Sequence, residues 1–182
     1  MPTDVEIASN ALILIGHTPI QSLADDHRVE ALYPTAYKAL LTEYAWNFAT
    51  TKAQFSRLVA APLNEYQYQY QLPSDLLLID RTYPMTNYKI FEDKLYTDAT
   101  EIEADYRFKP AEQYLPPYFV QLFEFFLASK LAIPITSNKA TAEEYREAYK
   151  EWRRTARFLD AQSAPQDQNV HQPFVEARYG DR

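Results

Sequence analysis

The spacing of apolar residues changes twice along this chain of 182 residues, and the change limits the folds that the chain can adopt. In residues 33–50, apolar side chains recur at steps of three and four, which places them on one face of a helix. In residues 66–71, tyrosines alternate with glutamines, which is the period of a strand. From residue 119 the helical spacing returns. The sequence therefore predicts an α+β fold that is mainly α, a bundle of about four helices with a small antiparallel β insertion and an extended C-terminal tail.

We expect a single domain over residues 1–163, with helices at about 3–16, 25–58, 116–133 and 140–162, and the β insertion at about 64–109. Thr3 with Glu6 forms a capping-box pattern, and Gly16 can take the left-handed conformation that ends the first helix. Thr141 with Glu144 offers a second capping box. Pro34 either bends the second helix or separates two abutting pieces of it.

Four further segments of the insertion have strand patterns. Residues 88–91 and 94–97 flank Glu92-Asp93 and predict a β-hairpin without the usual glycine. Residues 102–108 alternate apolar and polar side chains, and residues 76–79 read as a short buried strand. The middle of the chain is therefore expected to be a small antiparallel sheet.

The composition excludes several classes of protein. There is no cysteine, so disulfides and thiolate metal sites are excluded. The net charge of −7 argues against a surface that binds nucleic acid throughout. The N-terminal residues lack a basic region before their apolar run, and no run approaches about 18 apolar residues, so neither a signal peptide nor a membrane span is expected. The 15 tyrosines indicate either extensive protein–protein contact or an aromatic-rich core.

The sequence offers little catalytic chemistry. With 2 glycines it has no phosphate-binding loop, and His17 and His27 lack the spacing of a zinc motif, so we expect no cofactor, no metal and no enzymatic activity. Glu101 and Glu103 are the one carboxylate pair considered for glycoside hydrolysis, and adjacent surface acids are far commoner than catalytic pairs.

Three groups of residues are candidates for binding. Tyr66, Tyr68 and Tyr70 are expected on one face of a strand, where they either stack sugars or bases or form a half-buried surface against a helix or a neighbouring subunit. A basic line on the last helix faces DNA or an acidic neighbour, or else it is a solvated face with Glu143, Glu147 and Glu151 in pairing range. The line consists of Arg146, Lys150, Arg153 and Arg157.

The third candidate is the C-terminal arm, residues 164–182, which shows no periodicity and little apolar content. Phe174, Val175 and Tyr179 are its sparse anchors, of the kind that an extended segment inserts into a groove of a partner.

Two segments carry a resemblance to a known family. Trp46-Asn47-Phe48-Ala49 and Tyr70-Gln71-Leu72-Pro73, in order after the helix that ends in Gly16, resemble the head-to-tail adaptor proteins of tailed bacteriophages, the tail tubular protein A-like group. The likeness runs from about residue 7 to residue 162, and the final helices match mainly in pattern. The hairpin departs from it, because a glycine often stands near Asp93 in similar proteins.

The resemblance implies a structural virion protein and no enzyme. Such proteins assemble in the host cytoplasm into a ring, commonly of about twelve subunits, at the head–tail junction of the virion. The ring contacts the portal protein on one side and a tail or nozzle protein on the other, and DNA passes through its lumen without sequence-specific binding. The alternatives are a tail-associated cell-wall hydrolase and a carbohydrate- or nucleic-acid-binding module.

Overall fold

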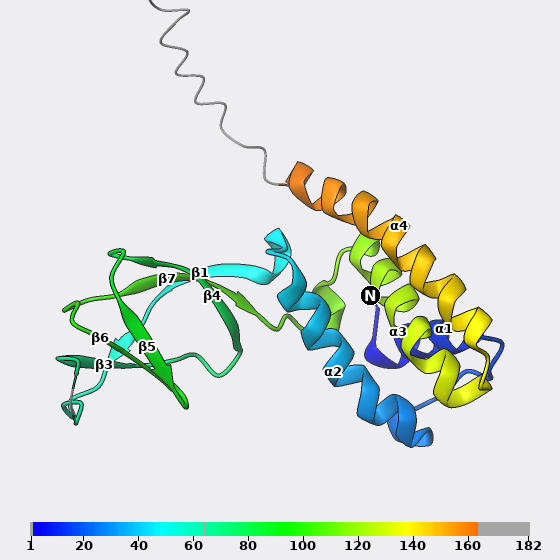
Figure 1. Cartoon of the computed structure of the whole chain (residues 1–182), viewed down its shortest axis with the longest axis horizontal. Helices are drawn as coiled ribbons and strands as arrows, with labels where there is room; N and C mark the ends of the chain where they lie inside the picture. The colour runs from blue at the N-terminus through cyan, green and yellow to red at the C-terminus, as the bar shows by residue number, and fades with distance from the viewer. Residues whose placement is uncertain (1, 64, 164–182) are drawn as a thin grey trace, which may run out of the picture.

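The computed structural model describes residues 2–63 and 65–163, which form two modules that lie side by side (Figure 1). The helical module contains four α-helices in the described residues: α1 (Asp4–Leu14), α2 (His27–Glu43), α3 (Pro117–Thr136) and α4 (Lys139–Ser163). Three short 3-10 helices, Leu23–Asp25, Asn47–Ala49 and Glu112–Tyr114, precede α2, the first strand and α3. The β module is inserted between α2 and α3.

The β module consists of two antiparallel sheets in the described residues. The first has the order β1 (Thr50–Gln54), β7 (Glu103–Phe108), β4 (Leu76–Tyr83). The second has the order β2 (Ser56–Arg57), β3 (Tyr68–Gln71), β6 (Lys94–Thr97), β5 (Tyr88–Phe91). Seven strands with a hydrophobic cluster of their own are a substantial part of the fold. The prediction of a mainly α protein with a small β insertion is therefore wrong.

The helix expected at 25–58 is also wrong beyond Glu43. Tyr44 has φ −144° and ψ 150°, and the chain continues through the 3-10 turn Asn47–Ala49 into β1. The Trp46 indole is buried, donates its N–H to the Leu40 carbonyl at 3.1 Å, and packs edge-on against Phe119 with ring centroids 5.2 Å apart. Because this aromatic packing stabilises an extended turn, it overrides the helical spacing of the local sequence.

The first helix is delimited as predicted. Thr3 and Glu6 form the reciprocal capping box. Gly16 has φ +77°, and the amides of Gly16 and His17 donate to the carbonyls of Ile13 and Leu12, both at 2.9 Å. These are the two hydrogen bonds of a Schellman ending, which requires the left-handed residue that glycine supplies.

The second predicted capping box is wrong. The Asn138 side-chain oxygen accepts hydrogen bonds from the amides of Ala140 and Thr141, so Asn138 rather than Thr141 caps the start of α4. The sequence left open whether Pro34 bends the second helix or divides it into two pieces. In the structure, α2 runs through Pro34 as one helix.

The helical module is centred on α3, which packs against α1, α2 and α4 and lies between α2 and α4 (Figure 1). Tyr33 and Tyr37 of α2 meet Phe123 of α3 with ring centroids 5.1 and 5.3 Å apart. By length and composition alone, α3 is apolar enough to cross a membrane. This differs from the expectation from the sequence, in which no uninterrupted apolar run approaches about 18 residues. In this fold its fully buried residues belong to the core shared with the other helices: Phe119, Leu122, Phe123, Leu127, Ala128, Leu131 and Ala132.

Candidate functional site

The segment Trp46–Ala49 joins the two modules. The backbone amide of Asn47 donates to the Asp160 carboxylate at 2.9 Å, and the Asn47 side chain donates to the Asp160 carbonyl at 2.7 Å. The other carboxylate oxygen of Asp160 accepts from the Tyr118 hydroxyl at 2.8 Å. Asp160 is fully buried. One carboxylate on α4 therefore fixes both the exit from α2 and the start of α3.

Every member of the basic line is paired with an acid. Arg146 and Lys150 form ion pairs of 2.6 Å with Glu143 and Glu147 one helical turn earlier. Arg153 and Arg157 both bind Glu43 at the end of α2, at 2.7 and 3.0 Å, and the Tyr149 hydroxyl donates to the same carboxylate. Four cations here share three carboxylates, so the pairing favours a partly neutralised, partly structural surface over a line of free cations that would hold DNA.

The three candidate tyrosines do not form a shared exposed face. Tyr70 is buried and donates its hydroxyl to the Ala99 carbonyl at 2.8 Å. The Tyr68 ring lies under the Arg57 guanidinium, 4.0 Å from the ring centroid. Tyr66 precedes β3 and lines a separate hollow. The predicted alternation is confirmed within β3, where Tyr68 and Tyr70 pack with the β cluster, but Tyr66 leaves it.

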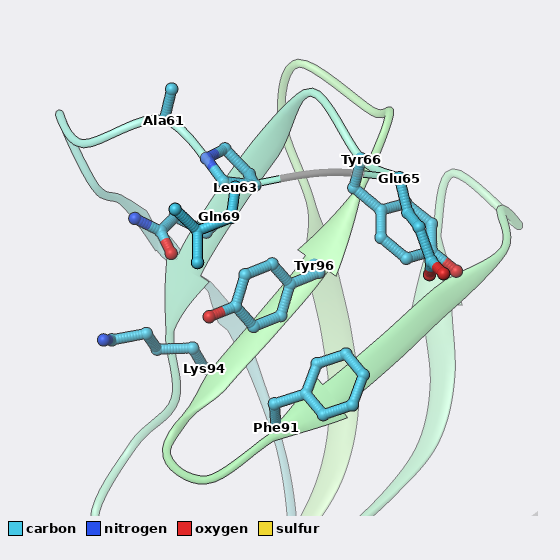
Figure 2. A pocket seen from close by; sticks show the side chains of 9 residues that line it. Ala61, Leu63, Glu65, Tyr66, Gln69, Phe91, Lys94 and Tyr96 are labelled. Atoms are coloured by element: carbon cyan, nitrogen blue, oxygen red, sulfur yellow. The ribbon is translucent and has the colours of Figure 1, made fainter.

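The hollow that Tyr66 lines is on the opposite, amide-bearing face of the second sheet (Figure 2). We call it the aromatic pocket, and it has a volume of about 400 Å³. Its walls are the loop residues Ala61, Pro62, Leu63, Glu65 and Tyr66 together with Gln69, Phe91, Lys94 and Tyr96 from the strands. Tyr96 lies directly opposite Gln69 in the β3–β6 register, and Phe91 lies opposite Lys94 in the β5–β6 register. From the sequence, these residues can be brought together only by counting the strand register outward from the Glu92-Asp93 hairpin turn.

Exposed apolar side chains occur on both modules. On the helical module, a groove of about 520 Å³ between α1 and the first half of α3 is lined mainly by Pro2, Leu14, Leu115, Pro117, Val120 and Phe125. On the β module, a hollow of about 450 Å³ is lined mainly by Leu72, Leu76, Leu78, Ile79 and Ile90. Leu78 and Ile90 are each 43% exposed. Apolar surface of this kind is typical of contact sites.

Burial controls the titration of the core. It raises the pKa of several tyrosines above the ordinary value of 10.0, most strongly at Tyr33, Tyr37, Tyr118 and Tyr149. Hydrogen bonds to carboxylates add to the effect at Tyr118 and Tyr149. Burial also raises the pKa of Glu124, against a hydrogen bond from Asn10. The Asp26 carboxylate, which caps α2, has its pKa lowered chiefly by hydrogen bonds from the Arg28 side chain.

The residues considered for chemistry are not brought together. Glu101 and Glu103 are both exposed and flank the buried Ile102. Over residues 2–63 and 65–163, no three metal-ligating side chains of the His, Cys, Asp and Glu types gather at one place. The arm anchors Phe174, Val175 and Tyr179 lie outside the described residues.

In comparison with known proteins, no protein-family model matches the chain, and no curated protein has a significantly similar sequence.

Proposed function

We propose that this protein is a structural adaptor of a tailed-bacteriophage virion, which forms a ring that joins the portal of the head to the tail and continues the DNA channel. The observation that carries the proposal is an apolar surface on each module of one subunit: the largely half-buried groove between α1 and α3, and the β-module hollow in which Leu78 and Ile90 are each 43% exposed. Each copy in a ring binds its neighbours through two different surfaces, because the contact is head to tail. Two such surfaces are the groove between α1 and α3 and the β-module hollow that contains Leu78 and Ile90.

The charge distribution supports a channel that DNA passes through. Each phosphate that a lysine or arginine contacts releases counterions and holds the duplex in place. Here the chain has a net charge of −7, and the basic line of α4 is bound to Glu43, Glu143 and Glu147. A surface partly neutralised in this way favours passage of DNA without sequence-specific binding.

The segments that carry the family resemblance have structural roles that fit the proposal. Trp46–Ala49 fixes the β module to the helical module through Asp160. In the other segment, Tyr70 and Leu72 are buried in the β module, and the Gln71 side chain donates to the Asp93 side chain at 2.9 Å across the hairpin turn. The first segment therefore joins the modules, and the second stabilises the β module, which carries one of the two contact surfaces.

The test is assembly with and without the portal protein, measured by mass photometry and negative-stain microscopy. We expect rings of about twelve subunits around a central hole, at least when portal is present. Leu78→Glu and Ile90→Glu place a carboxylate on the β-module surface and are expected to prevent ring closure while leaving the circular dichroism of the subunit unchanged. Ala39→Glu makes a comparable change at an exposed position of α2 outside both surfaces and should assemble normally.

A lone subunit under both conditions would refute the proposal, as would rings that form equally well from all three variants. The arm is tested separately by limited proteolysis of free protein and assembled particles. If Phe174, Val175 and Tyr179 bind the portal, cleavage within residues 164–182 decreases on assembly, and equal cleavage in both samples contradicts that role.

A further inference from the structure

We infer that the aromatic pocket of the β module binds a saccharide, with one pyranose ring lying on the Tyr96 side chain and an acidic substituent directed to Lys94. This inference does not depend on the adaptor role, because it uses a different face of the β module and a different set of residues. It assigns a ligand class to the aromatic pocket.

The pocket presents aromatic rings on several sides of a space large enough for a sugar. Figure 2 shows the Tyr96 ring in the centre of the site, with Phe91 and Tyr66 on two sides and Leu63 on a third. Phe91 is 54% exposed and meets Tyr96 edge-on, with ring centroids 5.5 Å apart. A pyranose has an apolar C–H face that fits on such a ring, and a concave site of a few hundred Å³ is the usual size for a small ligand.

Polar groups stand at one end of the pocket, where Figure 2 shows Lys94 and the Gln69 amide beside the Tyr96 hydroxyl. Gln69 is nearly buried, and its amide nitrogen donates to the Ala60 carbonyl at 2.8 Å, which holds the loop that forms the upper wall. Within the described residues, Lys94 forms no ion pair or hydrogen bond through its ammonium group. The adjacent Asp93 carboxylate is bound by the Gln71 side chain. Lys94 is therefore the cation available to an acidic ligand.

The same geometry disfavours the two other ligands that aromatic sites bind. Single-stranded nucleic acid needs several cations along its backbone, whereas the second lysine near this pocket, Lys89, is paired with Glu65 at 2.7 Å. An extended peptide gains its affinity by pairing with the edge of a sheet. Here the pocket lies on the face of the sheet, over β6, which is already hydrogen-bonded on both sides to β3 and β5.

The experiment is a binding titration of the full-length protein, by calorimetry and saturation-transfer NMR, against a defined panel. Its members are oligosaccharides of galacturonate, glucuronate and sialic acid, neutral malto- and chito-oligosaccharides, a thymidine oligonucleotide and a proline-rich peptide. We expect binding of at least one acidic oligosaccharide. Tyr96→Ala and Lys94→Ala should each weaken it by about tenfold or more, which corresponds to a lost contribution of about 1.4 kcal/mol.

Two matched controls exist in the helical module. Tyr114→Ala removes a tyrosine that is 68% exposed, and Lys38→Ala removes an exposed lysine, so both should bind like the unaltered protein. If Tyr96→Ala loses its circular dichroism spectrum, Lys94→Ala alone decides, since its side chain is outside the β cluster. Failure of every acidic oligosaccharide to bind, binding that Lys94→Ala leaves unchanged, or preference for the oligonucleotide or the peptide would overturn the inference.

Discussion

Asp160 provides the sharpest test of how the modules are joined. Its carboxylate is fully buried and accepts two hydrogen bonds, from the Asn47 amide at 2.9 Å and from the Tyr118 hydroxyl at 2.8 Å. A hydrogen bond to a charged group contributes about 1.5–3 kcal/mol, and truncating one partner leaves buried donors without an acceptor. After allowing for the desolvation that the carboxylate no longer requires, Asp160→Ala should lower the free energy of unfolding by about 3–5 kcal/mol.

Asp160→Asn should cost much less, about 1–2 kcal/mol. The amide oxygen can still accept from the Asn47 N–H, and the new NH₂ group can donate to the Tyr118 oxygen, because a phenol hydroxyl both donates and accepts. Only the charge assistance of the two bonds is then lost. The ratio between the two variants therefore distinguishes loss of hydrogen bonds from loss of charge.

The assay is urea unfolding followed by tryptophan fluorescence. Both tryptophans belong to the helical module, and the Trp152 indole donates to the Tyr118 carbonyl at 3.0 Å, so the signal reports on this region. Glu151→Ala, at an exposed position of the same helix, is the control and should stay within about 0.5 kcal/mol of the unaltered protein. A loss below about 1 kcal/mol for Asp160→Ala, or equal losses for Ala and Asn, would refute this account of the join.

Three further predictions concern pH and backbone conformation. Tyr33, Tyr37, Tyr118 and Tyr149 have raised pKa values in the folded protein. Their contribution to the free energy of unfolding is therefore complete below pH 10.0 and decreases as the pH rises further. We expect alkaline unfolding to coincide with the rise of tyrosinate absorbance. Asp26 has a lowered pKa, so its contribution to stability is lost at low pH rather than at high pH. Asp26→Asn should lower the free energy of unfolding by about 1 kcal/mol at neutral pH, and the difference in urea midpoint between this variant and the unaltered protein should shrink as pH falls below 3.8. Glu92 has φ +55°, so Glu92→Gly should raise the thermal midpoint by relieving about 1 kcal/mol of strain, whereas Glu103→Gly within β7 should lower it.

Much of the helical module follows from local sequence. The Thr3–Glu6 capping box and the ending at Gly16 are short-range patterns, and the structure contains both. The return of helical spacing from residue 119 is also followed by helices, α3 and α4. The hairpin around Glu92-Asp93 and the alternation of residues 102–108 are local in the same sense, and both are confirmed.

Apart from the cap of α4, which Asn138 rather than Thr141 supplies, the errors occur where non-local contacts decide. Residues 50–54 form β1 because they pair with β7, about fifty residues away, and their burial alternates only weakly. The rings of the aromatic pocket come from Tyr66, Phe91 and Tyr96, which only the pairing of β3, β6 and β5 brings together. Aromatic content indicated that tyrosines would matter, but their distribution between core, pocket and surface depends on sheet register.

The adaptor proposal also requires that the two modules keep a fixed orientation, and Arg107 is the residue on which we expect that orientation to depend. From β7 it donates to the Thr42 carbonyl in the last turn of α2 at 2.6 Å and forms a two-bond pair with Asp80 of β4 at 2.6 and 3.0 Å. Its side chain is only 13% exposed. Arg107→Ala should lower the free energy of unfolding by about 2–3 kcal/mol, and Arg107→Lys should recover little of it because lysine lacks the planar fork.

The orientation itself can be measured, because the chain has no cysteine and accepts two spin labels at exposed positions, Lys38→Cys on α2 and Glu101→Cys before β7. In the otherwise unaltered protein, double electron–electron resonance should give one narrow distribution of the distance between the two spin labels. Arg107→Ala should broaden this distribution. Lys52→Ala is the control, since its 3.4 Å pair with Asp105 lies within the β module and Lys52 is 62% exposed. If the distribution stays narrow in Arg107→Ala, the other contacts between the modules hold the orientation, and ring assembly should then tolerate the loss of Arg107.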